Sequence, residues 1–313
     1  MNKLYVLTLM ATLIFPLSAS ASAPQVTPSG LTPAAMYGDD AAQYTEKGNQ
    51  YYRDKDYAKA IECYDMAIAK DPTFAPAYNN KGNAESAGGR FDLALESFDK
   101  AVKSAPMLPE SYYNKGNALF MLGKPDEALS QYDKALSLDP KNADTYARKG
   151  DVLASMGRYE DAEAAYGKAL SINNGLTFAC FNMGAVLNRL GKYQDALGMF
   201  EQAIKLDPSY GRSWLMKGVA LFELGRYDES SKALDTAIKI KPDEDAYLNK
   251  GSALYKLGKY EEAVTAYDKA IELDPKYGSA YYFKAVALAG LGRKDEAKAA
   301  LIQAKKLDPS LAK

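Results

Sequence analysis

The sequence contains no histidine, two cysteines and one tryptophan among its 313 residues. Without histidine the chain cannot form a His-dependent catalytic triad, an imidazole metal site or an imidazole proton shuttle. The two cysteines, Cys63 and Cys180, fall in units with six predicted helices between them, whereas a disulfide needs Cα atoms within about 7 Å. We expect both to be small buried hydrophobic residues, with a redox role as the alternative.

The sequence also lacks an excess of either charge. It has 39 Lys and Arg against 40 Asp and Glu, a net charge of −1. Nucleic-acid binding usually needs a basic surplus because phosphate contacts supply most of its non-specific affinity, so the composition argues against a nucleic-acid partner. Carboxylate pairs such as Glu261 and Glu262 recur at helix starts, which is typical of helix-terminus electrostatics. We therefore predict no enzyme activity, no cofactor, no metal site and no small-molecule substrate.

One long apolar run is present, at the N-terminus. Leu4 to Leu17 follows Lys3 and is itself followed by small residues suited to signal cleavage. A membrane-spanning helix needs about 20 apolar residues, so the run is short for one. We predict that residues 1–23 are a secretory signal and that the chain is exported to the periplasm, the cell surface or the medium. An uncleaved signal that tethers the chain to the membrane is the alternative. Residues 24–40 read as a flexible Pro/Ser/Thr-rich linker, either a spacer or a remnant of processing.

The remaining sequence repeats itself with a period of 34 residues. One column of the repeat is glycine and another is proline. The glycines are Gly48, Gly82, Gly116, Gly150, Gly184, Gly218 and Gly251, and the prolines are Pro72, Pro106, Pro140, Pro208, Pro242, Pro275 and Pro309. The steps between neighbouring glycines are 34 residues, except for one of 33 before Gly251. Repetition at this period indicates an array of supersecondary units and not one globular core.

Residues 244–277 show what one unit builds. Apolar residues recur at helical spacing on both sides of Gly258, which predicts two amphipathic helices joined by a tight turn. Gly258 stands where the first helix needs a left-handed residue, and Pro275 ends the second helix. Gly251 lacks a side chain, so the two helices can approach closely.

These residues resemble the tetratricopeptide repeat. The positions that carry the resemblance, numbered as places 4, 8, 11, 15, 17, 20, 24, 27 and 32 of the unit, are Tyr247, Gly251, Leu254, Gly258, Tyr260, Ala263, Tyr267, Ala270 and Pro275. The match covers residues 41–311 as eight tandem units starting at residues 41, 75, 109, 143, 177, 211, 244 and 278. The resemblance implies an all-α, right-handed superhelical solenoid of helix-turn-helix units, an α-α superhelix.

Some residues depart from the repeat pattern. Lys55 replaces the turn glycine of the first unit, Glu85 takes an apolar place in the second, and Pro125 replaces the turn tyrosine in the third. In the eighth unit Lys298 and Lys305 replace apolar residues of the second helix. A terminal unit has no neighbour to cover that face, so we predict that the array ends there.

The first helices are expected to line the inner, concave face, with places 2, 5, 6, 9, 12 and 13 exposed on it. Places 6 and 9 are rich in asparagine, whose amide can pair with a peptide backbone of any sequence. The predicted polar contacts are Asn49, Asn80, Asn83, Asn114, Asn117, Arg148 and Asn182. Similar ladders occur in tetratricopeptide superhelices that hold unfolded polypeptide; the alternative is that asparagine is a tolerated surface residue.

Asn83, Asn114 and Arg148 also match three places of the clamp with which some family members bind a C-terminal carboxylate. Asn79 and Asp144 hold the two lysine places, so the predicted clamp is incomplete. Toward the C-terminal half the same face becomes apolar, with predicted peptide contacts at Phe181, Leu215, Phe222, Tyr255 and Tyr282. Packing against the neighbouring repeat is the alternative for some of them.

Lysine holds place 7 in seven units and Met183 holds it in the other. These lysines could form an anion track or, alternatively, bury their aliphatic stems and keep their ammonium groups in water. Taken together, the sequence predicts a non-catalytic scaffold that binds a peptide or partner protein along its concave groove. The alternative is a structural or assembly factor of a cell-envelope complex that acts through its convex face.

Overall fold

The structure is a computed structural model that describes residues 39–312. Within that range the regular elements are sixteen α-helices, α2 to α17, followed by a short 3₁₀ helix. The all-α prediction is therefore confirmed. Packing divides the described chain into two units, residues 39–172 and 173–312, which we describe separately. The predicted signal, and the predicted linker up to residue 38, lie outside the described residues.

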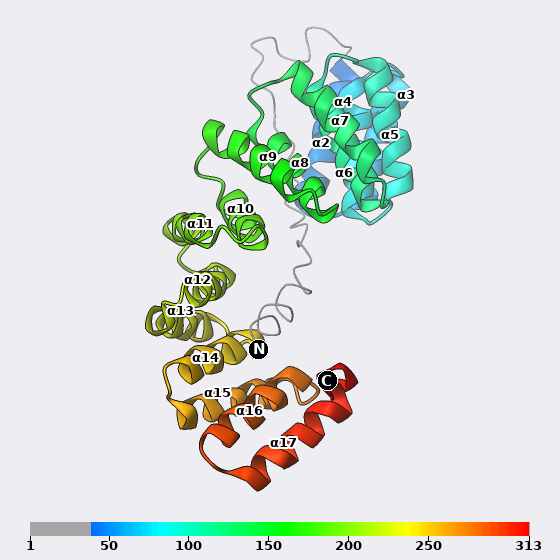
Figure 1. Ribbon diagram of the computed structural model, residues 1–313. Helices are drawn as coiled ribbons and strands as arrows, with labels where there is room; N and C mark the ends of the chain where they lie inside the picture. The colour runs from blue at the N-terminus through cyan, green and yellow to red at the C-terminus, as the bar shows by residue number, and fades with distance from the viewer. Residues whose placement is uncertain (1–38, 313) are drawn as a thin grey trace. The chain divides into compact units, whose positions relative to one another are not determined.

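The N-terminal unit contains four helix pairs. Its helices are α2 (Asp39–Arg53), α3 (Tyr57–Lys70), α4 (Ala75–Ala87), α5 (Phe91–Ser104), α6 (Pro109–Met121), α7 (Pro125–Leu138), α8 (Ala143–Ser155) and α9 (Tyr159–Ile172). Each even-numbered helix, the first helix of its repeat, packs on the odd-numbered second helix that follows it. The first helices also contact one another in sequence, so they form one continuous layer (Figure 1).

The C-terminal unit is built in the same way. Its elements are α10 (Thr177–Arg189), α11 (Tyr193–Leu206), α12 (Gly211–Glu223), α13 (Tyr227–Ile240), α14 (Glu244–Lys256), α15 (Tyr260–Leu273), α16 (Gly278–Gly290), α17 (Lys294–Leu307) and the 3₁₀ helix Pro309–Ala312. In both units the first helices begin at the predicted repeat starts, with one exception. Helix α2 begins at Asp39, two residues before the predicted start, and Asp40 in its first turn forms an ion pair with Lys70 at 3.7 Å. A carboxylate near a helix N-terminus is stabilised by the helix dipole, which favours this longer helix.

Glycine is required where the two helices of a repeat meet. A Cβ atom built on Gly251 would lie 2.5 Å from the Tyr267 ring, closer than real side chains come. The turn between the helices needs a positive φ, and Gly258 has a φ of 76° there. Lys55 adopts the same conformation at 60°, which is strained for a residue with a side chain.

Ion pairs join successive repeats inside each unit. The lysine at place 7 of one repeat reaches an acidic residue at place 25 of the repeat before it, over 2.5 to 2.9 Å. The pairs are Lys81–Asp65, Lys115–Asp99, Lys149–Asp133, Lys217–Glu201, Lys250–Asp235 and Lys284–Asp268. Each of these lysine side chains is 21 to 27% exposed, so its stem is largely buried while its ammonium group holds a carboxylate.

Both end repeats carry polar residues where inner repeats pack. Places 3 and 10 of the seventh repeat are Ala246 and Ala253, both 0% exposed. In the first repeat the same places are Gln43 and Gln50, which are exposed. Lys298 is likewise exposed in the last second helix, in agreement with the predicted polar end. The polar residues of the first repeat give the opposite end the same character.

Candidate functional site

The polar residues at place 9 of the first helices bond to tyrosines of the second helices. The hydroxyl of Tyr64 donates to Asn49 Oδ1 at 3.0 Å, and the hydroxyl of Tyr132 donates to Asn117 Oδ1 at 2.7 Å. The same contact joins Tyr166 to Asp151 at 2.6 Å and Tyr267 to Ser252 at 3.4 Å. Each of these side chains satisfies a tyrosine hydroxyl that would otherwise lose its hydrogen bond on burial. Place 9 therefore has a structural role in four repeats.

Places 9 and 24 change together along the chain. Where place 24 is Phe200, Leu234 or Leu301, place 9 is apolar; the corresponding residues are Ala185, Val219 and Val286. Asn83 is the exception, because it accompanies Phe98, which has no hydroxyl. Its amide is half-buried and forms no hydrogen bond with the described residues. The sequence carries this signal in the pairing of two columns, and neither column shows it alone.

The polar residues at place 6 are also engaged within the N-terminal unit. Asn80 Nδ2 donates to Asn49 Oδ1 at 2.9 Å, and Asn114 Nδ2 donates to the Oδ1 atom of Asn79 at 3.1 Å. These bonds link the first helices of neighbouring repeats. The predicted ladder of Asn49, Asn80, Asn114 and Asn117 thus bonds to other side chains of this unit.

Arg148 forms a buried ion pair. Its Nη1 atom lies 3.1 Å from Asp151 Oδ2, and the two side chains are 8% and 5% exposed. Of the three residues that match the carboxylate clamp, Arg148 therefore already binds a carboxylate of this chain. Asn182, at the same place in α10, is 7% exposed and so lies mostly below the surface.

The apolar part of the predicted site lies in the C-terminal unit. Leu215, Phe222, Tyr255 and Tyr282 come from three successive first helices, α12, α14 and α16, and each is half-buried. The ring of Phe222 contacts Tyr227 at a centroid distance of 5.2 Å, and Tyr255 contacts Tyr260 at the same distance. In each contact one part of the ring packs against the neighbouring tyrosine, and another part stays accessible to solvent. Phe181 differs, because it is only 2% exposed.

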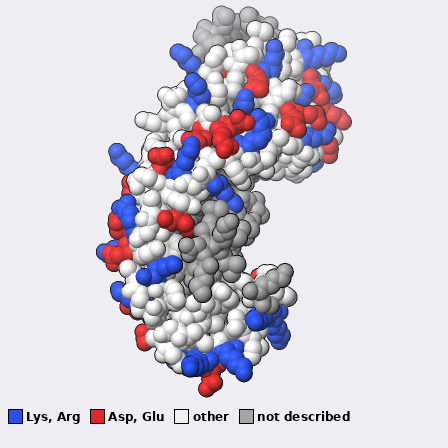
Figure 2. Space-filling view, viewed as in Figure 1, with Lys and Arg blue, Asp and Glu red and all other residues white. Residues whose placement is uncertain are grey.

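Burial changes the acidity of three side chains that the structure describes, Cys63, Cys180 and Glu85. Burial raises the pKa of Cys63 and raises that of Cys180 to about 11, so both thiols stay protonated at neutral pH. Burial also raises the pKa of Glu85, which accepts a hydrogen bond from Ser97 at 2.7 Å. Lys and Arg side chains are interspersed with Asp and Glu on the visible surface (Figure 2).

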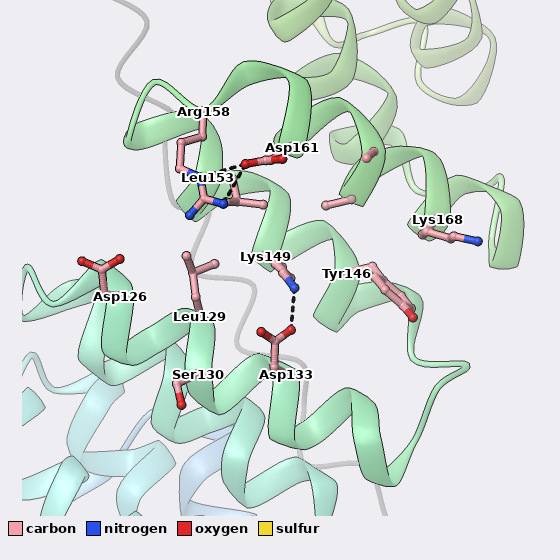
Figure 3. A pocket seen from close by; sticks show the side chains of 12 residues that line it. Asp126, Leu129, Ser130, Asp133, Tyr146, Lys149, Leu153, Arg158, Asp161 and Lys168 are labelled. Carbon is pink, nitrogen blue, oxygen red and sulfur yellow. Dashed lines mark hydrogen bonds and ion pairs between the residues drawn. The ribbon is translucent and has the colours of Figure 1, made fainter.

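A cavity of about 590 Å³ opens between α7, α8 and α9. Leu129, Leu153 and Ala165 contribute its buried lining, and the ion pair of Lys149 with Asp133 crosses it (Figure 3). Its lining comes from the first helix α8 as well as from the second helices α7 and α9, and it includes none of the residues predicted to bind peptide. Within each unit, every second helix packs on the first helix of the next repeat, and α7 packs on α8 less extensively than the others do. Sequence reasoning missed the cavity because the repeat pattern does not show this difference.

Neither a metal site nor a membrane span is found among residues 39–312. No group of three or more acidic or cysteine side chains there could hold a metal ion. No helix in the same range is long and apolar enough to cross a membrane.

Family models match nearly all of the repeated region. Tetratricopeptide repeat models match residues 109–142, 141–209, 187–251, 244–277 and 278–311, and a TPR repeat model matches residues 48–85 and 82–123. Together these ranges run from residue 48 to residue 311. The chain belongs to the tetratricopeptide repeat family. This membership supports a protein-interaction role in general. No curated protein sequence matches the chain.

Solved tetratricopeptide structures resemble the protein in fold. YrrB, described as "a TPR protein with an unusual peptide-binding site", is 26% identical with a TM-score of 0.53, and the alignment covers 63% of this chain and 99% of YrrB. The pilF protein of Pseudomonas aeruginosa is 20% identical with a TM-score of 0.60, over 69% of this chain and 98% of its own. A tetratricopeptide repeat protein of Parabacteroides merdae is 18% identical with a TM-score of 0.56, over 80% of this chain and 100% of its own. The last two likenesses concern the fold alone.

Proposed function

We propose that the protein is an exported, non-catalytic scaffold that binds a peptide segment of a partner protein along the first-helix face of its C-terminal unit. The observation that carries this proposal is the row of half-buried apolar side chains on α12, α14 and α16. Exposed apolar residues gathered on one face are typical of binding surfaces. Leu215 and Tyr255 are central to the row, and neither is needed to pair a buried polar group. The peptide-binding site named for YrrB supports the same mode of action.

The test is a binding measurement with short synthetic peptides of random sequence on an array. The full-length chain is compared with the double variant Leu215→Ser/Tyr255→Ser. Peptides selected by the parent should bind the variant roughly tenfold or more weakly, because a fully buried apolar side chain contributes about 1.5–3 kcal/mol.

The matched control is Leu273→Ser. Leu273 is 47% exposed and belongs to a second helix, α15, so it should leave peptide binding unchanged. Thermal melts of all variants separate loss of binding from loss of folding. Equal peptide binding by the parent and a folded double variant would contradict the proposal.

A second candidate is an assembly factor that acts through its second helices. The cavity between α7 and α9 favours it, because Asp126 and Lys168 lie at its two ends and form no ion pair with described residues (Figure 3). Ala164 is an exposed residue of its lining. Under this candidate Ala164→Arg would block assembly with the partner complex and the Leu215→Ser/Tyr255→Ser variant would not; size-exclusion chromatography of the purified complex reads this out.

A further inference from the structure

The cavity between α7, α8 and α9 is bordered by two helices that each turn a complete stripe of residues toward it. The stripes are Asp126, Leu129, Ser130 and Asp133 on α7, and Asp161, Ala164, Ala165 and Lys168 on α9. On both helices these residues follow one another at the spacing i, i+3, i+4 and i+7, with which helices pack against other helices. Each stripe is thus suited to contact one further helix.

The middle of the two stripes has the side chains that such a contact needs. Ser130 and Ala164 are exposed and short, so the backbone of an entering helix can come close to α7 and α9. Leu129 and Ala165 lie buried beneath them, and Leu153 of α8 completes the apolar lining. Larger apolar side chains of an entering helix would find apolar partners there.

Six charged side chains line the cavity, and four of them are already paired. The pairs are Lys149–Asp133 at 2.5 Å and Arg158–Asp161 at 2.7 Å. The other two are Asp126 and Lys168, which are exposed and form no ion pair with a described residue. The cavity therefore offers one uncommitted negative charge at one end and one uncommitted positive charge at the other (Figure 3).

Lys168 differs from the lysines at the same place, 26, of the two preceding repeats. Those lysines lie over the tyrosine at place 4 of their own repeat. The pairs are Lys100–Tyr78 and Lys134–Tyr112, with the ammonium nitrogen 5.9 and 6.0 Å from the ring centroid. In the fourth repeat the two places hold Lys168 and Tyr146, and no such contact joins them in the described chain. Both side chains line the cavity, so both are available to a partner.

We propose that this cavity binds one amphipathic α-helix of a partner protein, with a basic side chain opposite Asp126, an acidic side chain opposite Lys168 and apolar side chains between them. The inference rests on the second candidate function, the assembly factor, and adds the structure and the charge order of the segment that it would hold. It uses no residue of the first-helix row in the C-terminal unit.

The spacing of the two charges sets the spacing in the partner helix. Helices α7 and α9 run in the same direction (Figure 3), and Asp126 and Lys168 hold places 18 and 26 of their repeats. Eight places correspond to roughly 12 Å along the helix axis. The basic and acidic side chains of the partner should therefore be about seven or eight residues apart, which puts them on one face of its helix.

The experiment uses the full-length chain and synthetic amphipathic helices of about 18 residues, with alanine and leucine as the only other residues. One Lys and one Glu stand on the leucine face, in either order, about seven or about eleven residues apart, and both spacings keep the two charges on one face. Fluorescence anisotropy measures binding. The best peptide with the shorter spacing should bind roughly fivefold more tightly than any with the longer one, because only the shorter spacing lets both ion pairs form at once.

Charge reversal should switch the preference. Lys168→Glu should bind a peptide with two Lys residues at the shorter spacing roughly fivefold more tightly than the Lys/Glu peptide. Lys134→Glu is the matched control, because it reverses a lysine at the same place of α7 that lies over Tyr112 and does not line the cavity. It should keep the preference of the parent.

The same reversal applies at the other end of the cavity. Asp126→Lys should prefer a peptide with two Glu residues. Its matched control, Asp92→Lys, changes an exposed residue at the same place of the second repeat and should keep the preference of the parent. A preference for the Lys/Glu peptide that survives in Lys168→Glu or Asp126→Lys would overturn the inference.

Two further variants show where the helix binds. Ala164→Arg fills the middle of the cavity and should abolish binding, whereas Leu215→Ser/Tyr255→Ser should retain it; thermal melts confirm that both variants are folded. Binding that Ala164→Arg abolishes, but that shows no preference for charge spacing, would refute this inference and leave the second candidate function standing.

Two other results would overturn the inference. The first is a set of helices that bind the parent and Ala164→Arg equally, or bind neither. The assembly test with the partner complex would then decide the second candidate function by itself. The second is a dimer of the parent in size-exclusion chromatography that Ala164→Arg dissociates, since a second copy of this chain would then occupy the cavity in place of a partner helix.

Discussion

The first-helix faces of the two units use polar residues in opposite ways. In the N-terminal unit four of the predicted asparagines, Asn49, Asn80, Asn114 and Asn117, bond to tyrosines or to other asparagines, whereas Asn83 forms no hydrogen bond with the described residues. Arg148 is paired with Asp151. In the C-terminal unit the face is largely apolar. Asn188 has no hydrogen-bond partner there, and Arg212 contacts the Phe181 ring but forms no ion pair with the described residues. A polar side chain on a predicted binding face is thus available to a ligand only where the fold has not already used it.

The largest expected effect comes from breaking the internal polar network of the N-terminal unit. Asp151→Leu removes the partner that Asp151 provides for Arg148 and for the Tyr166 hydroxyl, so we expect a loss of about 3–5 kcal/mol in the free energy of unfolding. Urea denaturation measures it. The counterpart in the C-terminal unit, Ser252→Ala, should cost about 1 kcal/mol or less, because its bond to Tyr267 is 3.4 Å long. Equal losses would erase the contrast between the units.

A smaller effect should be the same in both units. Gly82→Ala and Gly251→Ala each place a Cβ within 2.6 Å of a buried ring, Phe98 or Tyr267, so each should lose about 1–3 kcal/mol by overpacking. Gly167→Ala is the matched control: it lies inside α9 with no atom within 4 Å, and alanine there should add about 0.5–1 kcal/mol. Thermal melts compare the three. A neutral Gly251→Ala would mean that the helices of that repeat can separate without cost.

Glu85 offers a pH test confined to the N-terminal unit. Its carboxylate is 4% exposed, at the place that Leu254 holds in the seventh repeat. Since burial raises its pKa above the ordinary 4.5, the folded state binds this proton more tightly than the unfolded state. Stability should therefore fall as the pH rises from about 4.5 through the raised pKa.

The variant that checks this is Glu85→Leu. It should lack that fall and be about 1–2 kcal/mol more stable at neutral pH, because a buried charge is replaced by an apolar side chain. Urea midpoints measured across the acid range compare it with the parent. Parallel pH profiles for the two proteins would show that Glu85 does not titrate in this range.

The smallest effect concerns the first turn. Lys55 has a φ of 60° where Gly258 and the other turns have glycine. Lys55→Gly should raise the free energy of unfolding by about 0.5–1 kcal/mol, because the strain relieved at this left-handed position exceeds the entropy cost of ordering a glycine. Lys55→Ala keeps the strain and serves as the control in the same thermal melt. A gain from alanine equal to that from glycine would show that the turn is not strained.

The sequence was sufficient to predict the helices and their starts, because the same pattern of residues recurs in eight repeats and each repeat supports the same assignment. The starts at Ala75, Pro109 and Ala143, the turn at Gly258 and the polar end at Lys298 all follow from that pattern. It was not sufficient for the site. Place 9 lies at the edge between the exposed face and the helix-helix contact. The Asn117 side chain turns toward that contact because Tyr132 offers it a hydroxyl group. The period of the repeat alone does not show which residue stands opposite place 9.

The cavity beside α7 and the unpaired amide of Asn188 also could not be predicted from any single position of the repeat. A cavity depends on how far two helices stand apart, and Leu129 and Leu153 by themselves read as ordinary core residues. Asn188 follows the helical pattern as any polar residue would, and only its burial without a partner distinguishes it. The empty volume beside α7 and the missing hydrogen bonds of Asn188 both depend on three-dimensional packing, so the sequence pattern does not predict them.

The lysine-to-carboxylate pairs between repeats bear on how such a chain can change length. The second, third, sixth and seventh repeats each present a cation on the side that meets the repeat before and an anion on the side that meets the repeat after, as Lys115 and Asp133 do in the third repeat. The fourth repeat has Gly167 in place of the anion, and the fifth has Met183 in place of the cation. Any such repeat can follow any other without a new contact having to arise. Duplication or loss of any one of these four repeats would therefore leave the same kind of ion pair at the new junction, so the number of repeats could change there without a new type of contact.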